Sequence, residues 1–309
     1  MRRGGSSSAG ELRDRSDVVA YFDELLDAFE LAATRTGRHE QFFRMGNEVV
    51  RLCFAGDALA ESLTAAIAHL EVPPVQSAAL TISIWDSRSS SVEMLPPRWS
   101  NEHYGARGEI NGFESHGFFI HYEIRTEALT MIDLEAGRAI FWVRDASRIP
   151  WWESVSPFRV LLNRWADHRG MLALHAAGVG TADGGAILVG GCGSGKSTTA
   201  FACVDGAFRH AGDDTVLVVS SPAPTVHSVY STAKLTDWSL ARFPHLRGLA
   251  ERVPGDADSK SIFFLHRVLP KVLIDRFPLK AILLPTVTGE STTRFLPAPR
   301  GSGVDGPGA

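Results

Sequence analysis

The segment AILVGGCGSGKSTTA, residues 186–200, constrains the fold more than any other part of this chain. It contains a complete G-x-x-x-x-G-K-[ST] pattern from Gly190 to Ser197. Glycines let backbone N–H groups approach a di- or triphosphate, the lysine reaches the outer phosphates, and the serine hydroxyl can contact Mg²⁺. The apolar stretch GAILVG precedes the loop and STTAFACV follows it, so a strand, a loop and a helix are expected in that order. This context favours a nucleotide-phosphate site over a glycine-rich turn with a chance lysine.

Composition indicates an ordinary globular protein. The chain has 309 residues, 44% of them hydrophobic and 21% charged, and a formal net charge of -4. Such a balance gives no broad basic field for nucleic acid, and no apolar run is long enough to span a membrane. The three cysteines, Cys53, Cys192 and Cys203, show no CxxC spacing and no paired framework. We therefore expect a cytoplasmic protein without nucleic-acid or membrane partners.

The first half of the chain has a mixed α and β pattern. Apolar residues recur at helical spacing over residues 18–37, with Ser16 or Asp17 as the expected N-cap and Gly37 as the stop. Residues 48–56 and 79–87 are typical of strands, and DALAESLTAAIAHL, residues 57–70, predicts a helix capped by Asp57.

Three short β-rich segments over residues 112–143 predict an antiparallel meander, and residues 155–170 predict a linking helix that ends at Gly170. The predicted fold class is α/β, with a C-terminal P-loop domain preceded by an α+β accessory domain. The expected ranges are a disordered tail at 1–16, the accessory domain at 17–160, the P-loop domain at 161–298 and a disordered tail at 299–309.

The acidic pair Asp213-Asp214 lies 17 positions beyond Lys196, in FRHAGDDTVLVV. A transport-type ATPase places its acidic motif after an apolar strand, whereas here the apolar run follows the pair. Adjacent carboxylates near a triphosphate can divide two tasks, one holding Mg²⁺ and the other accepting a proton from an attacking hydroxyl. The alternative is a turn or cap before a strand, which is a common surface feature. Behind a P-loop, the pair favours transfer to a hydroxyl.

The order of these features resembles the catalytic domain of HPr kinase/phosphorylase. That pattern consists of a histidine (His175 in LALHAAGVG), a strand, the loop GGCGSGKST, a short helix and AGDD. It is also similar to the loop and Gly-Asp-Asp of phosphoenolpyruvate carboxykinases. The segments VHSVYSTAKLT and LKAILLPTVTG, and the front half of the chain, look like HPr-kinase-like proteins of ribosomal peptide pathways, including lasso peptides. One departure is Ala176, where HPr kinases usually carry glycine after the histidine.

The resemblance implies an ATP-dependent serine kinase that acts on a peptide or small protein, with ATP and Mg²⁺ as cofactors. Ser197 and one of Asp213 or Asp214 would hold Mg²⁺, the other aspartate would be the base, His175 would assist the proton transfer, and Lys196 would serve catalysis. The expected nucleotide-binding residues are Gly190, Gly191, Cys192, Gly193, Ser194, Gly195, Lys196, Ser197 and Thr198.

Two further residues are candidates for the substrate side. Ser231 and Lys234 lie in VHSVYSTAKLT, where the lysine could meet a phosphate or a peptide carboxylate, or could be a solvated lysine on a turn. A different class of function also stays open: a non-catalytic module that binds nucleotide and changes partners. The resemblance leaves a homo-oligomer open, since HPr kinases assemble as hexamers.

Overall fold

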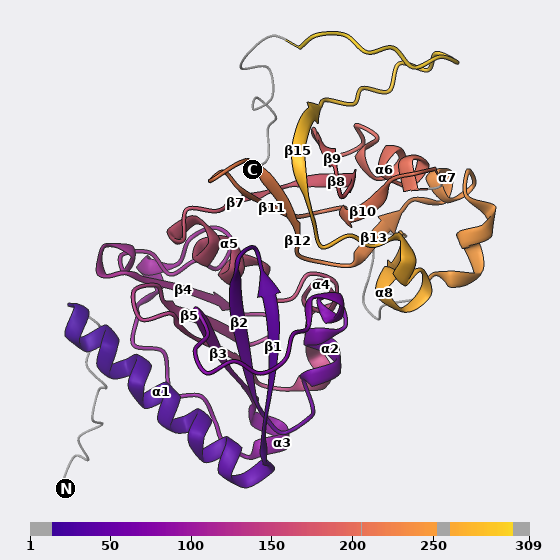
Figure 1. The fold of residues 1–309 in the computed structure, drawn as a ribbon. Helices are drawn as coiled ribbons and strands as arrows, with labels where there is room; N and C mark the ends of the chain where they lie inside the picture. The colour runs from indigo at the N-terminus through magenta and orange to yellow at the C-terminus, as the bar shows by residue number, and fades with distance from the viewer. Residues whose placement is uncertain (1–13, 205, 252–259, 299–309) are drawn as a thin grey trace, which may run out of the picture. The chain divides into compact units, whose positions relative to one another are not determined.

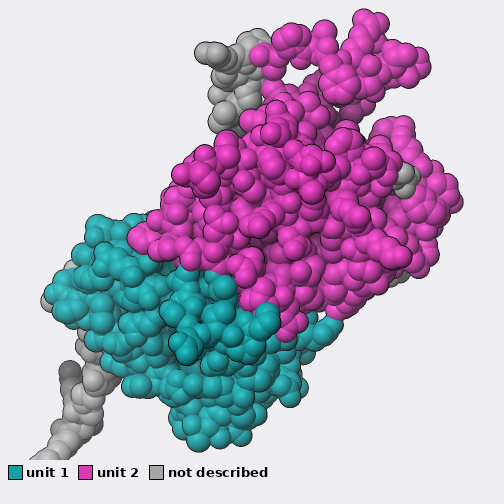
Figure 2. All heavy atoms as spheres, viewed as in Figure 1, with its two compact units in different colours: residues 1–42, 49–62, 73–150 teal, residues 43–48, 63–72, 151–309 magenta. Residues whose placement is uncertain are grey.

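The structure is a computed structural model that describes residues 14–204, 206–251 and 260–298. It has a mixed α/β fold with mixed parallel and antiparallel sheets (Figure 1). The chain divides into two compact units (Figure 2): residues 1–42, 49–62 and 73–150 form the first, and residues 43–48, 63–72 and 151–309 the second. Both predicted tails lie largely outside the described residues. The second unit includes residues 43–48, 63–72 and 151–160, all of which fall in the predicted accessory domain at 17–160 and not in the predicted P-loop domain at 161–298.

The first unit is built on a six-stranded sheet with the order β1-β2-β3-β6-β5-β4. Its strands are β1 (Arg38–Met45), β2 (Glu48–Ala55), β3 (Leu80–Asp86), β4 (Phe118–Glu123), β5 (Ala128–Asp133) and β6 (Arg138–Val143), and its helices are α1 (Arg15–Thr36), α2 (Ala60–Thr64) and α3 (Ser87–Ser90). Strands β2, β3 and β6 run parallel, whereas β4, β5 and β6 form antiparallel pairs. The predicted meander is thereby confirmed.

Helix α1 covers one face of this sheet because its apolar residues recur every three or four positions. Val18, Phe22, Leu25 and Phe29 are buried against sheet residues in one hydrophobic cluster. Burying side chains of this size contributes about 1.5–3 kcal/mol each. The helix begins after Asp14, whose carboxylate accepts the backbone N–H of Asp17, so the predicted N-caps were wrong by two or more positions. It ends at Gly37 as predicted, with φ +88°.

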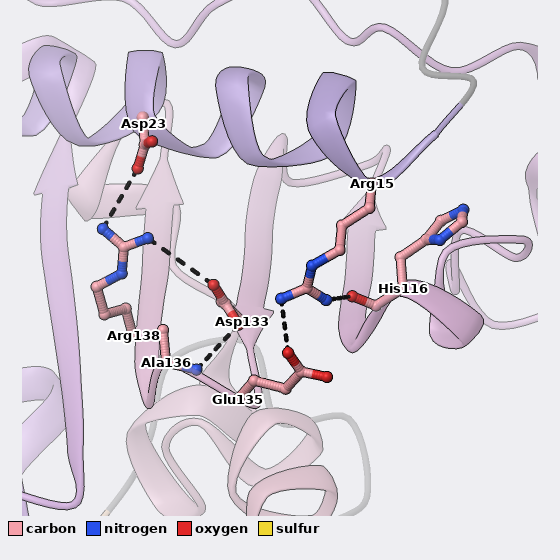
Figure 3. A network of polar contacts seen from close by, with 7 residues as sticks. All are labelled: Arg15, Asp23, His116, Asp133, Glu135, Ala136 and Arg138. Atoms are coloured by element: carbon pink, nitrogen blue, oxygen red, sulfur yellow. Dashed lines mark hydrogen bonds and ion pairs between the residues drawn. The ribbon is translucent and has the colours of Figure 1, made fainter.

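Charged residues connect α1 to β5, β6 and the neighbouring loops (Figure 3). Arg15 donates to the carbonyl of His116 and to Glu135 at 2.7 Å, while Arg138 lies 3.3 Å from Asp23 and 3.8 Å from Asp133. The Arg15–Glu135 and Arg138–Asp23 pairs are exposed and contribute about 0–1 kcal/mol each, so burial of the apolar face supplies most of the stabilisation. Arg15 was predicted to belong to the disordered tail, but Asp14 caps a helix that already includes it.

The predicted helix at residues 57–70 is broken. Residues 60–64 form α2 and residues 68–70 form a short 3-10 helix. The side chain of Asp57, the predicted cap, is 98% exposed and lies 3.2 Å from His39 Nδ1. The carbonyl of Ala66 accepts the N–H of Ser231 at 2.7 Å. Because this tertiary bond occupies the carbonyl that Leu70 would need, the α-helix does not continue.

The second unit contains a seven-stranded sheet with the order β10-β8-β9-β15-β12-β11-β7, and a separate pair, β13-β14. Its strands are β7 (Leu172–Leu174), β8 (Ala176–Thr181), β9 (Gly184–Val189), β10 (Arg209–Gly212), β11 (Val216–Val219), β12 (Thr225–Ser228), β13 (Thr232–Leu235), β14 (Ser261–Phe264) and β15 (Arg276–Leu283). Its helices are α4 (Trp151–Val155), α5 (Arg159–His168), α6 (Lys196–Val204), α7 (Asp237–Leu240) and α8 (Leu265–Val268). Among the described residues, β9 and β15 form the one parallel strand pair of this sheet, and its other strand pairs are antiparallel.

Alternating residues of β8 and β9 serve two separate cores. Ala176 and Ile187 pack with Val216, Val226 and other residues of strands β10 to β15. Their neighbours Ala177 and Leu188 face the opposite way and pack with Ala200 of α6. The period-two pattern of two short strands thus places α6, the helix that follows the glycine-rich loop, against one face of the sheet.

Candidate functional site

The glycine-rich loop connects β9 to α6 as the sequence predicts. Residues 190–195 form the connection, and the N–H of Thr199 donates to the carbonyl of Gly195 at 2.9 Å in the first turn of the helix. Gly193 and Gly195 have φ of +80° and +95°, which residues with a side chain rarely adopt. A Cβ on Gly190 would lie 2.8 Å from Ser194 Oγ. The loop conformation therefore depends on its glycines.

The side chain of Lys196, the first residue of α6, reaches back to the carbonyls of this loop. Its side-chain ammonium donates to the carbonyl of Gly190 at 2.5 Å and to that of Gly191 at 3.1 Å, and the residue is 8% exposed. Cys192, at the top of the loop, is exposed. Within the described parts of the chain this buried ammonium has only neutral carbonyl partners, so an anion in the loop would compensate its charge.

Strand register brings His175 and the acidic pair together. Leu174, at the end of β7, pairs with Val216 at the start of β11. His175 follows Leu174 directly, and Asp214 precedes Val216 by two residues, so both lie at the same end of this antiparallel pair. His175 Nδ1 lies 3.9 Å from Asp214 Oδ1. The two candidate residues, which are far apart in sequence, thus belong to one site.

Asp213 is the buried member of the pair. One carboxylate oxygen accepts the backbone N–H of Lys234 at 3.0 Å, while the other is buried without a hydrogen-bond partner among the described residues. Burial raises the pKa of the carboxyl from 3.8 to about 6, although the Lys234 N–H and the nearby Ser197 side chain oppose the rise. A partnerless buried carboxylate oxygen beside a serine side chain forms an oxygen-rich position that a divalent cation can satisfy.

Asp214 is more accessible than Asp213, and nearby positive charges stabilise its ionised form. Burial raises its pKa, but the Lys234 ammonium, at 2.6 Å, and the His175 and Arg159 side chains outweigh burial and keep the pKa below its ordinary value. The His175 pKa is itself lowered, first by burial, although Asp214 opposes this. His175 therefore stays neutral near pH 7 and can accept a proton.

Lys234 connects the two carboxylates. Its backbone binds Asp213, its ammonium binds Asp214, and its side chain lies 5.5 Å from the centre of the Trp151 ring. Its side chain is 19% exposed. Of the two interpretations that the sequence left open, the structure excludes a solvated lysine on a turn.

Thr198 and Ser231 have structural partners. The Thr198 hydroxyl bonds to that of Ser239 at 2.8 Å and so ties α6 to α7, which leaves its backbone N–H as the group that faces the loop end of the helix. Ser231 is completely buried, and its hydroxyl lies 3.1 Å from both the Ala66 carbonyl and His266 Nδ1. The predicted contact of Ser231 with a substrate was wrong, because no surface of the residue is accessible.

Sequence reasoning missed Arg159. This exposed residue begins α5, and its charge lowers the pKa of both Asp214 and His175, so it lies within electrostatic range of the pair. Its segment was predicted only as a linking helix. No local motif marks the residue, because its place in the site arises from the packing of α5 on β7.

Comparisons with known proteins do not identify the chain. No protein-family model matches it, and no curated protein matches it either. Among the described residues, no helix has the length and apolar character needed to cross a bilayer.

Proposed function

We propose that this chain is an ATP-dependent serine kinase of the HPr-kinase-like type, which transfers the γ-phosphoryl group of ATP to a serine of a peptide or small protein. One observation carries the proposal: the buried Asp213 carboxylate, one oxygen of which has no hydrogen-bond partner among the described residues, lies near the side chain of Ser197, which follows the glycine-rich loop. Ser197 and Asp213 supply the oxygen ligands that Mg²⁺ takes next to nucleotide phosphates. Bound there, the cation would neutralise phosphate charge.

Phosphate binding and proton transfer are assigned to different residues of the chain according to how buried they are. Loop N–H groups and Lys196 bind the outer phosphates, for which Lys196 gives up its bonds to the loop carbonyls. Asp214, the accessible carboxylate, accepts the proton of the serine hydroxyl, and His175 lies beside it to assist. The bond from the serine oxygen to the γ-phosphorus forms as the bond from that phosphorus to the β,γ-bridging oxygen breaks, and ADP leaves.

The proposed architecture follows the order of the motifs. His175 at a strand junction, a strand, the glycine-rich loop, α6 and the acidic pair occur in the order found in HPr-kinase-like domains. We assign the kinase domain to residues 161–298 and an accessory domain to residues 17–160. The first unit would then position the acceptor or a regulatory partner, since the groups argued to act on phosphate belong to the second unit.

A non-catalytic nucleotide-binding module is the second candidate, favoured by one contact. The ion pair between Lys234 and Asp214 occupies the carboxylate that would receive the proton. If this pair persists when nucleotide is bound, ATP would bind and no hydroxyl would be activated.

The test is a transfer assay with γ-labelled ATP, Mg²⁺ and a pool of serine-containing precursor peptides. The Asp214→Asn variant removes the proposed base, and Asp183→Asn, at an exposed hairpin position, is the matched control. Label on a peptide serine that is lost in Asp214→Asn and kept in Asp183→Asn would support the kinase. Tight ATP binding without peptide label would reject the kinase in favour of the binding module, and the absence of ATP binding would reject both.

A further inference from the structure

A cavity lies in the second unit, lined by residues that the proposed nucleotide site does not use. It is a cavity of about 260 Å³ formed by the turn after β1, the segment around the 3-10 helix at 68–70, the end of β12 and the start of β15. Pockets for drug-sized ligands measure roughly 300–1,000 Å³, so this cavity suits a smaller metabolite.

Charged residues of both signs are among those that line the cavity. They are Arg44 and Arg276, which are basic, and Glu71 and Asp275, which are acidic, and all four are exposed. Among the described residues, none of these four side chains forms an ion pair or a side-chain hydrogen bond with another protein group. Oppositely charged groups that line one cavity without pairing are available to opposite charges on a ligand.

The buried polar residues of the cavity are neutral. His69 Nε2 lies 2.7 Å from the hydroxyl of Ser228, which is 1% exposed. Burial, with the charges of His266 and His210, lowers the pKa of His69 to about 3, and burial with the charge of Arg276 lowers that of His227 to about 4. Both imidazoles are therefore uncharged at neutral pH, and the lining carries two formal positive and two formal negative charges.

We infer that this cavity binds a small zwitterion, namely a free α-amino acid, whose carboxylate pairs with Arg276 or Arg44 and whose ammonium pairs with Glu71 or Asp275. A ligand with no net charge matches a lining with no net charge, because each ligand charge then replaces its lost hydration by an opposite group. A simple anion would leave the two carboxylates unpaired and close by. The volume admits a molecule of this size.

The site differs from the nucleotide site but is connected to it through one strand pair. Ser228, at the end of β12, is the register partner of Val216, two residues beyond Asp214. No residue that lines the cavity belongs to the glycine-rich loop or to the acidic pair. Amino-acid binding can therefore be measured without nucleotide, and its outcome does not depend on kinase activity.

The test titrates the full-length chain with each proteinogenic amino acid by calorimetry, with inorganic phosphate and methylamine as single-charge probes. Arg276→Gln and Asp275→Asn remove one charge of each sign at exposed positions, and Arg125→Gln and Asp183→Asn are the matched exposed controls. Removing one charge-assisted contact should weaken binding by about tenfold or more.

Saturable binding of at least one amino acid, weakened about tenfold in both cavity variants and unchanged in both controls, would support the inference. The N-acetyl and methyl-ester derivatives of that amino acid, which each lack one charge, should then bind as weakly. The absence of any binding, binding of phosphate as tight as that of the amino acid, or binding that survives both substitutions would each overturn it.

Discussion

Replacing Asp213 by asparagine should stabilise the nucleotide-free protein at neutral pH while it removes the proposed cation ligand. The carboxylate is 5% exposed, and burial raises its pKa from 3.8 to about 6. A carboxyl whose pKa is higher in the folded state than in the unfolded state favours folding at low pH and opposes it at high pH. The cost develops as the pH rises from about 4 to about 6 and is complete near pH 7.

The magnitude follows from that rise. At about 1.4 kcal/mol for each pH unit, ionised Asp213 costs about 3 kcal/mol of folding free energy at neutral pH. Asparagine carries no charge, and its oxygen can still accept the Lys234 N–H. Because the amide NH₂ would take the place of an oxygen that has no hydrogen-bond partner among the described residues, burying it offsets part of this gain, and we expect a net gain of about 2 kcal/mol.

Urea unfolding of both proteins, at about pH 7.5 and about pH 5, would measure the difference. The cost of the native carboxyl should fall from about 3 kcal/mol to about half of that at the lower pH, where the group is largely protonated, so the net advantage of Asp213→Asn should fall from about 2 kcal/mol to about half a kcal/mol. Asp214→Asn is the control of opposite sign: its pKa is lowered in the folded protein, so removing the charge should destabilise at neutral pH by up to about 1 kcal/mol. Loss of stability in Asp213→Asn at pH 7.5, or a difference independent of pH, would refute the assignment of Asp213 as a buried carboxylate of raised pKa.

Three further predictions concern the loop and its cation. Lys196→Ala should lower peptide phosphorylation by at least about a hundredfold in the labelled-ATP assay, with an unfolding free energy within about 1 kcal/mol of the parent, because the ammonium contacts only two loop carbonyls. Gly193→Ala should weaken ATP binding, because a residue with a side chain pays about 1–2 kcal/mol to adopt φ of +80°. Gly191 has as much free space around a Cβ but no positive φ, so Gly191→Ala should bind ATP like the parent. Equal losses in the two variants would contradict this prediction. The affinity of the parent protein for Mg²⁺ and ATP should fall between pH 7 and pH 5 by about tenfold more than that of Asp213→Asn, because a protonated Asp213 carboxyl is a poor metal ligand. Parallel pH profiles of the two proteins would contradict this prediction.

Local chemistry made part of this fold predictable. The sequence signals of α1, the meander and the loop between β9 and α6 lie within the elements themselves: an apolar repeat, alternating strands with polar turns, and glycines before a lysine. The break in the predicted helix at 57–70 had no such signal. It arises because Ser231, far along the chain, occupies the carbonyl of Ala66, and intrinsic helix propensity is overridden by tertiary contacts of this kind.

The site shows the same division between local and tertiary information. The types of its residues were predictable, since a loop lysine, a serine and paired aspartates each have a chemical reason to occur near phosphate. The separate role of each aspartate was not predictable from the sequence. Whether Asp213 or Asp214 faces the loop depends on which one lies next to the Ser197 side chain, and that depends on how α6 packs on β8 and β10.

Lys234 is the residue whose role the arrangement most alters. Because its backbone N–H holds Asp213 and its ammonium holds Asp214, one residue of β13 sets the positions of both carboxylates and separates their pKa values. The two pKa values shift in opposite directions. Burial raises that of Asp213, whose contact with Lys234 is a neutral N–H, and the charge of the Lys234 ammonium lowers that of Asp214. Two adjacent aspartates with the same intrinsic pKa thereby become chemically distinct. In the proposed kinase, the buried aspartate would take the cation as its counter-charge, and the accessible aspartate would exchange the proton.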